Sequence, residues 1–450
     1  MNTPHLRPKI AVVGAGWAGL SAAVSLARRV DVTVFEAGRQ AGGRARTLAG
    51  NTDGFSFLDN GQHILLGAYH GVLTLMEHIG ADPEDAFCRL PLRWHMYEGL
   101  QFQSTNLPSP LHILTGILRA KNVSFLLKTK LLSDMSALQH YARGKRADLA
   151  VAQWLRQRNV PRRLVTEFWQ PLVWGALNTP LEHASLRVLC NVLSDGVWAD
   201  KSGSDYLLPK RDLGAIIAEP ALAKLKQFGT DIRLETRVGR LKNLPDGRVV
   251  VNDEVFDAVI VAVAPYHAVH LFPEDTPDYI QTTYQNLRYH SITTVYLRYA
   301  VPVHLPAPLT GFADGAAQWL VYRGALGLPT NEVAAVISVS DYVGAFKSQE
   351  WAEKVHADVK RICPYLDEPE AVRVITEKRA STACTPDSAT PDFAWLHQRR
   401  IYPAGDYLHP RYPATLEAAV QSGLMAAERC LADFGLIYRS SDSHLKCNFP

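Results

Sequence analysis

The sequence has few cysteines, no long apolar run and only a small net charge, and each of these excludes a class of protein. It has 6 cysteines among 450 residues, without a CxxC pair or a His/Cys spacing that could hold zinc. No stretch approaches the roughly 20 apolar residues of a transmembrane helix. The net charge of +3 is far from the strongly basic balance of a nucleic-acid-binding protein. We therefore expect reduced, mostly buried thiols, no metal site, no membrane span and no nucleic-acid partner.

Composition and the N-terminus narrow the class further. Hydrophobic residues make up 47% of the chain, which is enough to bury a large core and excludes a disordered protein. A short polar lead runs directly into a strand-like stretch and leaves no room for a signal peptide. We expect a cytoplasmic protein, or one held at the inner face of the cell membrane.

A strand–helix–strand unit opens the chain. Residues 9–13 (KIAVV) form a β-branched run, residues 14–29 have helical spacing, and residues 30–36 (VDVTVFE) alternate like a second strand. A glycine-rich turn joins the first strand to the helix. This is the arrangement in which a turn and a helix N-terminus bind a dinucleotide.

The turn reads G14-A-G16-W-A-G19. Gly14 permits a tight turn, Gly16 lets backbone N–H groups approach a pyrophosphate, and Gly19 lets helix and strand pack closely. Glu36 follows the first glycine by 22 positions, close to the ~20 at which an acid binds a ribose hydroxyl. A glycine-rich turn alone is weak support, but the strands, helix and acid together indicate FAD or NAD more than NADP.

Two further stretches favour FAD. A paired glycine and an arginine follow the acid in A37-G-R-Q-A-G-G43-R44, and a Gly-Asp pair, Gly405–Asp406, lies near the end of the chain. A helix begins near Pro413 with Thr415 in its first turn. Asp406 could approach the ribityl or pyrophosphate region, and the helix N-terminus could stabilise a negative charge on a reduced flavin. The alternative is an ordinary turn capped by an aspartate.

These motifs resemble the FAD-binding pattern of the flavin amine oxidase and carotenoid desaturase superfamily. The stretches DNGQHILLGAY, LPSPLHILTGILRA, FWQPL and SDYLLPKRDL are similar to its squalene-associated branch, the bacterial hydroxysqualene dehydroxylases of hopanoid biosynthesis. The resemblance runs from about residue 9 to residue 430. Carried over by motif, it implies that FAD contacts Gly14, Ala15, Gly16, Trp17, Ala18, Gly19, Glu36, Ala37, Gly43, Arg44, Asn60, Gly61, Val238, Gly405, Asp406, Thr415 and Leu416.

The resemblance implies an α/β fold. A Rossmann-like FAD-binding domain of the glutathione-reductase-like type would be interleaved with a mixed helical and sheet substrate domain. We expect the FAD-binding domain to comprise residues 1–90, 201–265 and 385–436, and the substrate domain residues 91–200 and 266–384. Residues 437–450 read as a polar tail.

The implied activity is reductive dehydroxylation of hydroxysqualene to squalene, with a hydride from reduced FAD. A functional association with the presqualene diphosphate and hydroxysqualene synthases would follow from the same family context. Three alternatives stay open: a polyprenyl or carotenoid desaturase, an amine oxidase, and a non-enzymatic lipid carrier with the flavin fold. Nothing in an FAD fingerprint encodes the direction of electron flow.

The polar turn in DNGQHILLGAYH supplies the candidate catalytic residues. The resemblance places residues 60–63 across the flavin ring, and His63 titrates near neutral pH, so it is our candidate general acid for the leaving hydroxyl. The alternative is an ordinary structural histidine. Gln62 would lie against the flavin beside it, and Asp59 would cap the turn or orient His63.

Substrate residues are expected in the tryptophan-rich middle of the chain. The resemblance marks Trp169, Trp174 and Asn178, and the two indoles could stabilise a developing carbocation. The alternative is that these tryptophans belong to the core.

Residues 107–145 are expected to form helices that could face a membrane. Leu111, Leu114, Ile117 and Leu118 are expected on one helical face, and seven Lys or Arg against one acid lie between residues 119 and 146. The alternative is a normal surface helix with a solvated basic face.

Overall fold

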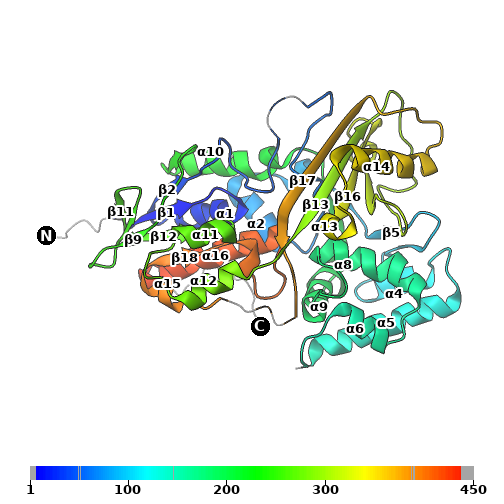
Figure 1. The fold of residues 1–450 in the computed structure, drawn as a ribbon, viewed down its shortest axis with the longest axis horizontal. Coiled ribbons are helices and arrows are strands. Elements are labelled where there is room, and N and C mark those ends of the chain that lie inside the picture. Colours follow the sequence, from blue (N-terminus) through cyan, green and yellow to red (C-terminus); the bar gives the residue numbers. More distant parts are fainter. Residues whose placement is uncertain are drawn as a thin grey trace.

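The structure is a computed structural model that describes residues 7–48, 50, 52–144, 146–386, 388 and 391–436. The expected tail, residues 437–450, lies outside the described residues, as does Lys145. Figure 1 shows a parallel sheet covered by helices and, beside it, a second sheet with a group of helices beneath. The mixed α/β class predicted from the sequence is confirmed.

The first sheet contains five parallel strands in the order β18-β12-β1-β2-β8. The central strand β1 and its neighbour β12 are almost wholly buried, because helices cover both faces of such a sheet. The predicted strand–helix–strand unit is confirmed, with α1 joining β1 to β2. The bounds are β1 (Lys9–Val13), α1 (Trp17–Leu26), β2 (Asp31–Phe35), β8 (Asp231–Arg233), β12 (Ala258–Val261) and β18 (Ile401–Pro403).

Helix α1 is packed between this sheet and α16 (Leu416–Asp433). All but one of its residues are buried. A Cβ on Gly423 of α16 would lie 2.1 Å from the carbonyl oxygen of Ala18, so only glycine allows the two helices to approach this closely. The Ser21 hydroxyl donates to the Val420 carbonyl at 3.0 Å and fixes the crossing.

The chain leaves β1 toward β2 on one side, and β12 pairs with β1 on the other. This reversal is the topological switch point of an open α/β sheet, where a crevice at the carboxyl ends of the strands holds ligands. The glycine-rich turn lies at the carboxyl end of β1.

The second sheet is antiparallel, in the order β14-β15-β16-β13-β17. Its side chains alternate between two cores. Val295 and Leu297 of β13 pack with α14, whereas Tyr296 faces the helical group. The bounds are β13 (Tyr289–Arg298), β14 (Leu309–Gly311), β15 (Trp319–Tyr322), β16 (Glu332–Ser338), α14 (Ser348–Ile362) and β17 (Ala371–Thr382).

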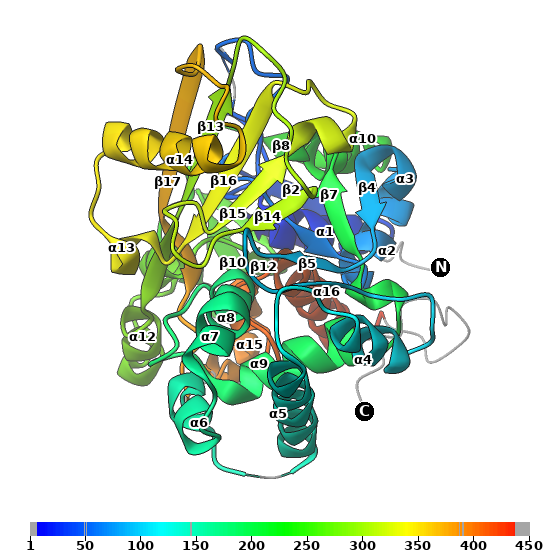
Figure 2. The same cartoon turned by 90° about the vertical axis from the view of Figure 1, so that its right-hand side faces the viewer.

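The helical group lies below the second sheet in Figure 2. Its core is rich in aromatic side chains, including Trp94, Trp154 and Trp169. The helices are α4 (Leu111–Leu118), α5 (Phe125–Arg143), α6 (Val151–Gln157), α7 (Arg162–Leu164), α8 (Gln170–Leu177) and α9 (Leu186–Leu193), with a π-helical turn, η2 (Ser194–Trp198), after α9.

One expected domain boundary is wrong. We placed residues 266–384 in the substrate domain, but α11 (Pro265–Leu271) and α12 (Asp278–Gln285) pack in the same core as β1 and β12. Apolar side chains of these helices, such as Ala268 and Ile280, cover the parallel sheet, so the chain returns to the second sheet only at β13.

The remaining elements connect these parts. They are β3 (Leu65–Leu66), α2 (His70–Ile79), α3 (Pro83–Ala86), β4 (Phe87–Leu90), β5 (Arg93–His95), β6 (Gln101–Gln103), β7 (Tyr206–Pro209), a π-helical turn η4 (Gly214–Ala218), α10 (Glu219–Gln227), β9 (Lys242–Asn243), β10 (Val249–Val251), β11 (Glu254–Phe256), α13 (Ser340–Val343) and α15 (Ala394–Gln398). Within the described ranges, no helix is both long and apolar enough to cross a bilayer. In the same ranges the five cysteines are free thiols, and no group of acidic, histidine or cysteine side chains could hold a metal ion.

Candidate functional site

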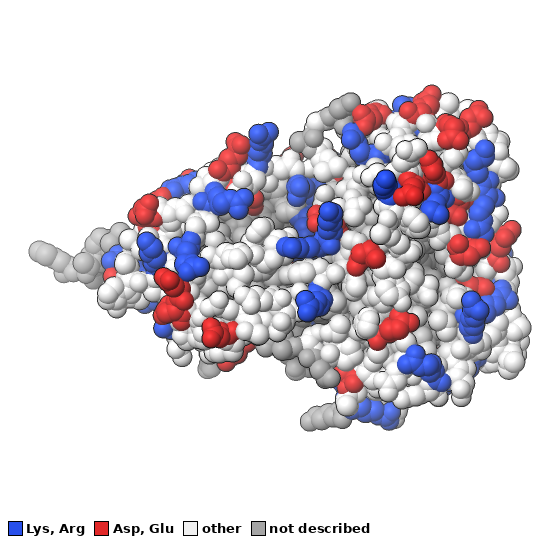
Figure 3. Space-filling model, in the orientation of Figure 1, with Lys and Arg blue, Asp and Glu red and all other residues white. Residues whose placement is uncertain are grey.

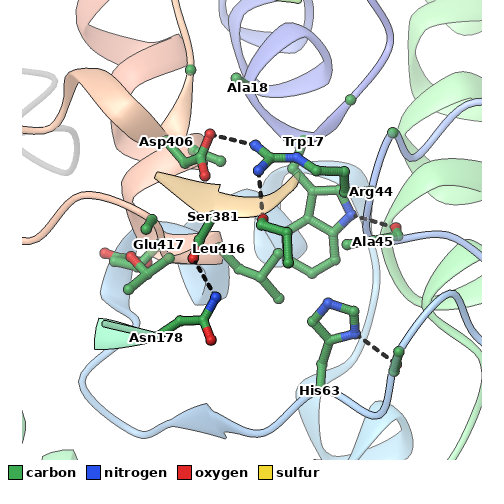
Figure 4. A pocket seen from close by; sticks show the side chains of 18 of the residues that line it. Trp17, Ala18, Arg44, Ala45, His63, Asn178, Ser381, Asp406, Leu416 and Glu417 are labelled. Atoms are coloured by element: carbon green, nitrogen blue, oxygen red, sulfur yellow. Dashed lines mark hydrogen bonds and ion pairs between the residues drawn. The ribbon is translucent and has the colours of Figure 1, made fainter. Parts of the chain in front are cut away.

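A cavity of about 890 Å³ opens at the carboxyl ends of the parallel strands and extends toward the second sheet. Its wall combines the glycine-rich turn, the polar turn at residues 60–63, the N-terminus of α16 and side chains of α8 and β15. Figure 4 shows Arg44 and Asp406 directed toward each other at this wall, with His63 and Asn178 at other positions around it. The volume lies at the upper end of the range for ligand sites.

The glycine-rich turn has the geometry that the sequence predicted. Gly14 has φ +103°. A Cβ there would lie 2.4 Å from the carbonyl oxygen of Ala262, which directly follows the neighbouring strand β12. A Cβ on Gly19 would lie 1.8 Å from the Gly14 carbonyl oxygen, so Gly19 serves helix packing and does not line the cavity. The first turn of α1 therefore presents its N–H groups, which have no partner within the helix, to the cavity.

The Glu36 carboxylate is held at the end of β2. It accepts one hydrogen bond from the Ala15 N–H at 2.8 Å and another from the Gly38 N–H at 2.7 Å. Glu36 and Ala37 line the cavity, whereas Ala15 does not. The acid is thus fixed beside the glycine-rich turn, where a ribose hydroxyl would be recognised.

Arg44 and Asp406 connect two segments more than 360 positions apart in sequence. The Arg44 guanidinium donates to the Asp406 carboxylate at 2.5 Å and to the Ala380 carbonyl oxygen at 2.6 Å. Burial opposes charge on Arg44, but the neighbouring Asp406 raises the pKa of Arg44 above its ordinary value. Arg44 and Asp406 therefore form a charged pair in the cavity wall, and Gly43 and Gly405 lie beside it.

The N-terminus of α16 points into the cavity. Thr415 caps it, with its hydroxyl accepting from the Ala418 N–H at 3.0 Å, and both Thr415 and Leu416 line the wall. Glu417 accepts from the Gly71 and Val72 N–H groups at 2.7 and 2.9 Å, which joins α16 to the N-terminus of α2. Burial raises the pKa of Glu417, which these N–H groups oppose.

The polar turn at residues 60–63 also lines the cavity. The Asn60 side-chain amide donates to the Glu377 carboxylate at 3.1 Å, and the Gln62 N–H donates to the Thr294 hydroxyl at 3.3 Å. Both partners belong to the second sheet. The turn therefore lies where the two parts of the molecule meet.

His63 does not titrate near neutrality, and the reason for choosing it as general acid was wrong. Burial, together with the charge of Arg44, lowers its pKa to about 4 despite a hydrogen bond to Gly61. Its Nδ1 lies 2.8 Å from the Gly61 carbonyl oxygen and donates to it, because a carbonyl can only accept. The ring is thus neutral at pH 7, with Nε2 as an unprotonated acceptor.

Asp59 does not orient His63. It is 3% exposed, does not line the cavity, and accepts hydrogen bonds from the Leu213 N–H at the start of η4. Burial is the main cause that raises its pKa to about 7. The carboxyl group therefore anchors the polar turn from behind, on the start of η4.

A buried ion pair holds the segment that leads into the polar turn. Arg323 and Glu332 are both fully buried, with Nε and Oε2 3.3 Å apart. Arg323 also donates to the Phe57 carbonyl oxygen at 3.0 Å, and Glu332 accepts from the Ser56 N–H at 2.8 Å. No local motif indicated this pair, because its members are distant from the turn in sequence.

The far end of the cavity is apolar. Its wall takes single side chains from many elements and loops, mainly Ile64, Leu66, Leu92, Trp94, Leu172, Leu193, Val197, Leu309, Trp319 and Val336. The sequence predicted an apolar substrate wall only for residues 64–66, which follow the polar turn. The other side chains in this list were not predicted. Trp94 drew attention only as part of a tryptophan-rich region.

Two of the three predicted substrate residues lie away from this wall. Trp169 is fully buried among Trp154 and Phe168, so the core alternative fits it. Trp174 is half-buried and does not line the cavity either. Asn178 does line it. Its amide donates to Ser381 at 2.9 Å and accepts from the Val339 N–H at 2.7 Å, which ties α8 to the second sheet.

The polar end suits FAD residue by residue. Of the predicted contacts, Gly14, Gly16, Trp17, Ala18, Glu36, Ala37, Gly43, Arg44, Asn60, Gly61, Val238, Gly405, Asp406, Thr415 and Leu416 line the cavity. Glycines without room for a Cβ, a fixed acid and two helix N-termini together form a cradle for a dinucleotide. Sequence reasoning missed other residues at this end, such as Tyr266, His267 and Glu377.

Comparison with known proteins finds relatives along nearly the whole chain. A hydroxysqualene dehydroxylase from Rhodopseudomonas palustris is 30% identical over 94% of this chain and 98% of its own. One from Zymomonas mobilis is 25% identical over the same shares. A 15-cis-phytoene desaturase from Narcissus pseudonarcissus is 24% identical over 97% of this chain and 82% of its own.

Solved structures show the same fold at lower identity. Cyclohexylamine oxidase from Brevibacterium oxydans superposes with a TM-score of 0.70 at 15% identity, over 95% of this chain and all of that one. A putative protoporphyrinogen oxidase from Exiguobacterium gives 0.67 at 19% identity, over 94% and 99%. The family model for flavin containing amine oxidoreductase matches residues 17–431. The chain therefore belongs to the flavin-containing amine oxidoreductase family and is an FAD-dependent oxidoreductase.

Proposed function

We propose that this protein reductively dehydroxylates hydroxysqualene to squalene in squalene and hopanoid biosynthesis. The observation that carries the proposal is the continuity of one cavity, polar at the FAD end and apolar at the other. An amine or another small polar substrate would not require so extended an apolar wall. The three relatives named hydroxysqualene dehydroxylase support the same substrate.

The reaction exchanges a hydroxyl for hydrogen. Reduced FAD, when bound, would supply a hydride for the new C–H bond and, with its second hydrogen, the proton with which the oxygen leaves as water when the C–O bond breaks. The apolar wall excludes bulk water from the carbon that loses its hydroxyl.

His63 has a different part in this reaction from the one its sequence suggested. With Nδ1 donating to Gly61, its Nε2 can accept a hydrogen bond from the substrate hydroxyl and position the carbinol. The polar turn also places Asn60 and Gln62 at the junction of the polar and apolar ends. The protein's contribution is therefore to position the substrate and exclude water.

A desaturase that acts on a polyprenyl chain is the second candidate. The relatives named 15-cis-phytoene desaturase favour it, and the same apolar wall would serve it. The two activities differ in the direction of electron flow. An association with the synthases that precede hydroxysqualene stays a prediction.

Product analysis separates the candidates. Purified protein with FAD and dithionite would be incubated with hydroxysqualene, phytoene or an alkylamine, and a parallel set would contain oxidised FAD without dithionite. We expect squalene from hydroxysqualene in the reduced set alone. Conversion of phytoene or the amine in the oxidised set, with hydroxysqualene unchanged in both, would overturn the proposal.

A further inference from the structure

The corner formed by α4 and the start of α5 exposes an unusual group of large apolar side chains. Phe125 and Leu126, at the N-terminus of α5, are 72% and 77% exposed, more than any other large hydrophobic side chain in the described part of the chain. The group, here called the α4–α5 corner, consists of Leu107, Leu111, Leu114, Leu118, Phe125 and Leu126. Helices α4 and α5 are in contact, and Lys128 near the start of α5 donates to the Leu118 carbonyl oxygen at 3.1 Å. Exposed large apolar side chains on two such neighbouring segments indicate an interaction surface.

The exposed leucines are additional to the face that α4 uses for packing. Ile117 was expected on the exposed apolar face, but it is buried with Ile113 in the helical core, and His112 is fully buried. The opposite face of the same helix carries Leu111, Leu114 and Leu118. Helix α4 is thus apolar on both faces, which the fold alone does not require.

The segment that forms the α4–α5 corner carries basic side chains and no acidic ones. No Asp or Glu occurs from residue 99 to residue 133, whereas four Lys or Arg do. Arg119 and Lys121 are exposed, while Lys130 is paired with the buried Asp134. Elsewhere, on the face in Figure 3, basic and acidic groups are intermixed.

The corner borders the apolar end of the cavity. The Ser109 hydroxyl, just before α4, donates to the Trp198 carbonyl oxygen at 2.8 Å. His112 Nε2 lies 3.4 Å from the Ser204 hydroxyl. Ser204 and the neighbouring turn η2 line the cavity, so one layer of residues separates the corner from the cavity wall.

We propose that the α4–α5 corner binds the surface of an anionic lipid bilayer. The apolar side chains enter the boundary between headgroups and acyl chains, and Arg119 and Lys121 contact lipid phosphates. A second copy of the chain is a poorer occupant, because a two-fold contact would bring two basic surfaces without acidic partners into one interface. Delivery of a polyprenyl alcohol from the bilayer to the cavity rests on the proposed function; the binding itself does not.

Vesicle sedimentation tests the binding directly. The full chain, loaded with FAD, would be spun with phosphatidylcholine vesicles that contain or lack phosphatidylglycerol. We expect binding that requires the anionic lipid and weakens with salt. The double variant Phe125→Ser/Leu126→Ser should bind on the order of 10²-fold more weakly, and Arg119→Gln/Lys121→Gln roughly 10-fold more weakly.

The control is Tyr279→Ser/Val301→Ser, which removes two exposed apolar side chains elsewhere and should bind as the unaltered protein does. Retained flavin absorbance and an unchanged melting temperature would show that each variant is folded. No binding by the unaltered protein, or equal binding by the Phe125→Ser/Leu126→Ser variant, would overturn the proposal. So would a change from dimer to monomer in that variant by light scattering without a change in vesicle binding. None of these outcomes depends on turnover, so the proposed function can fail independently.

Discussion

The polar end of the cavity comes from a few short segments, whereas the apolar end takes single side chains from elements spread between residues 64 and 336. The glycine-rich turn, Glu36 and the capped N-terminus of α16 each form a recognisable local pattern. The side chains at the apolar end share only hydrophobicity and a position in the folded chain. The comparison indicates that cofactor recognition is encoded locally and substrate recognition by tertiary packing.

The largest expected effect concerns the junction between the two ends. Glu332→Gln leaves the Arg323 guanidinium buried without a counter-charge, so the free energy of unfolding should fall by about 3–5 kcal/mol. Urea denaturation measures it. The control Glu370→Gln breaks a more exposed pair with Arg298 and should cost less than about 1 kcal/mol. Equal losses would show that the buried pair does not hold the junction together.

A single added methyl group should weaken FAD binding at the polar end of the cavity. In Gly14→Ala the Cβ meets the Ala262 carbonyl oxygen at 2.4 Å, so FAD affinity should fall by ~10²-fold, equivalent to about 3 kcal/mol. The control Gly80→Ala also places alanine at a positive φ, but its Cβ would meet no atom within 4 Å. FAD titration followed by flavin absorbance compares the two. If both variants bound FAD as the unaltered protein does, the turn would not be the cradle described.

These two substitutions show what the sequence could reveal. Gly14 and its role follow from spacing alone, as do β1 and α1. Thr415 was expected in the first turn of a helix starting near Pro413, whereas it caps α16, which begins at Leu416. Arg323 and Glu332 do not, because each is an unremarkable charged residue until the fold buries it. His63 illustrates an intermediate case: its motif placed it at the cavity correctly, but its low pKa depends on burial and on Arg44, which spacing does not encode.

A substitution at His63 tests the junction of the polar and apolar ends of the cavity. If Nε2 only accepts a hydrogen bond from the substrate, His63→Gln should lower kcat/KM roughly 10-fold, the loss of one hydrogen bond. A general acid would account for ~10²-fold or more. In the unaltered protein, the profile of kcat/KM against pH should show no step near pH 6.5, since burial lowers the pKa of His63 to about 4. A step there that vanishes in the variant would restore the acid role.

The last prediction concerns how stability depends on pH and rests on Asp59, behind the polar turn. The folded protein keeps a proton on this carboxyl up to about pH 7, whereas an ordinary aspartate releases it near 3.8. Stability should therefore decrease as pH rises through this interval. Asp59→Asn removes this dependence on pH and keeps an acceptor for the Leu213 N–H, so any gain in stability over the unaltered protein should appear at pH ~8 and be absent at pH ~5. Urea midpoints at pH ~5 and pH ~8 would check the sign, and a variant less stable at both would contradict it.

The central claim is that a polyprenyl alcohol meets the flavin at the junction of the two ends. Mixing the photoreduced protein with hydroxysqualene in the absence of oxygen tests it most directly. We expect the flavin absorbance to return to the oxidised spectrum and squalene to appear in an amount equal to that of the flavin reoxidised. A flavin that stays reduced with hydroxysqualene would contradict it.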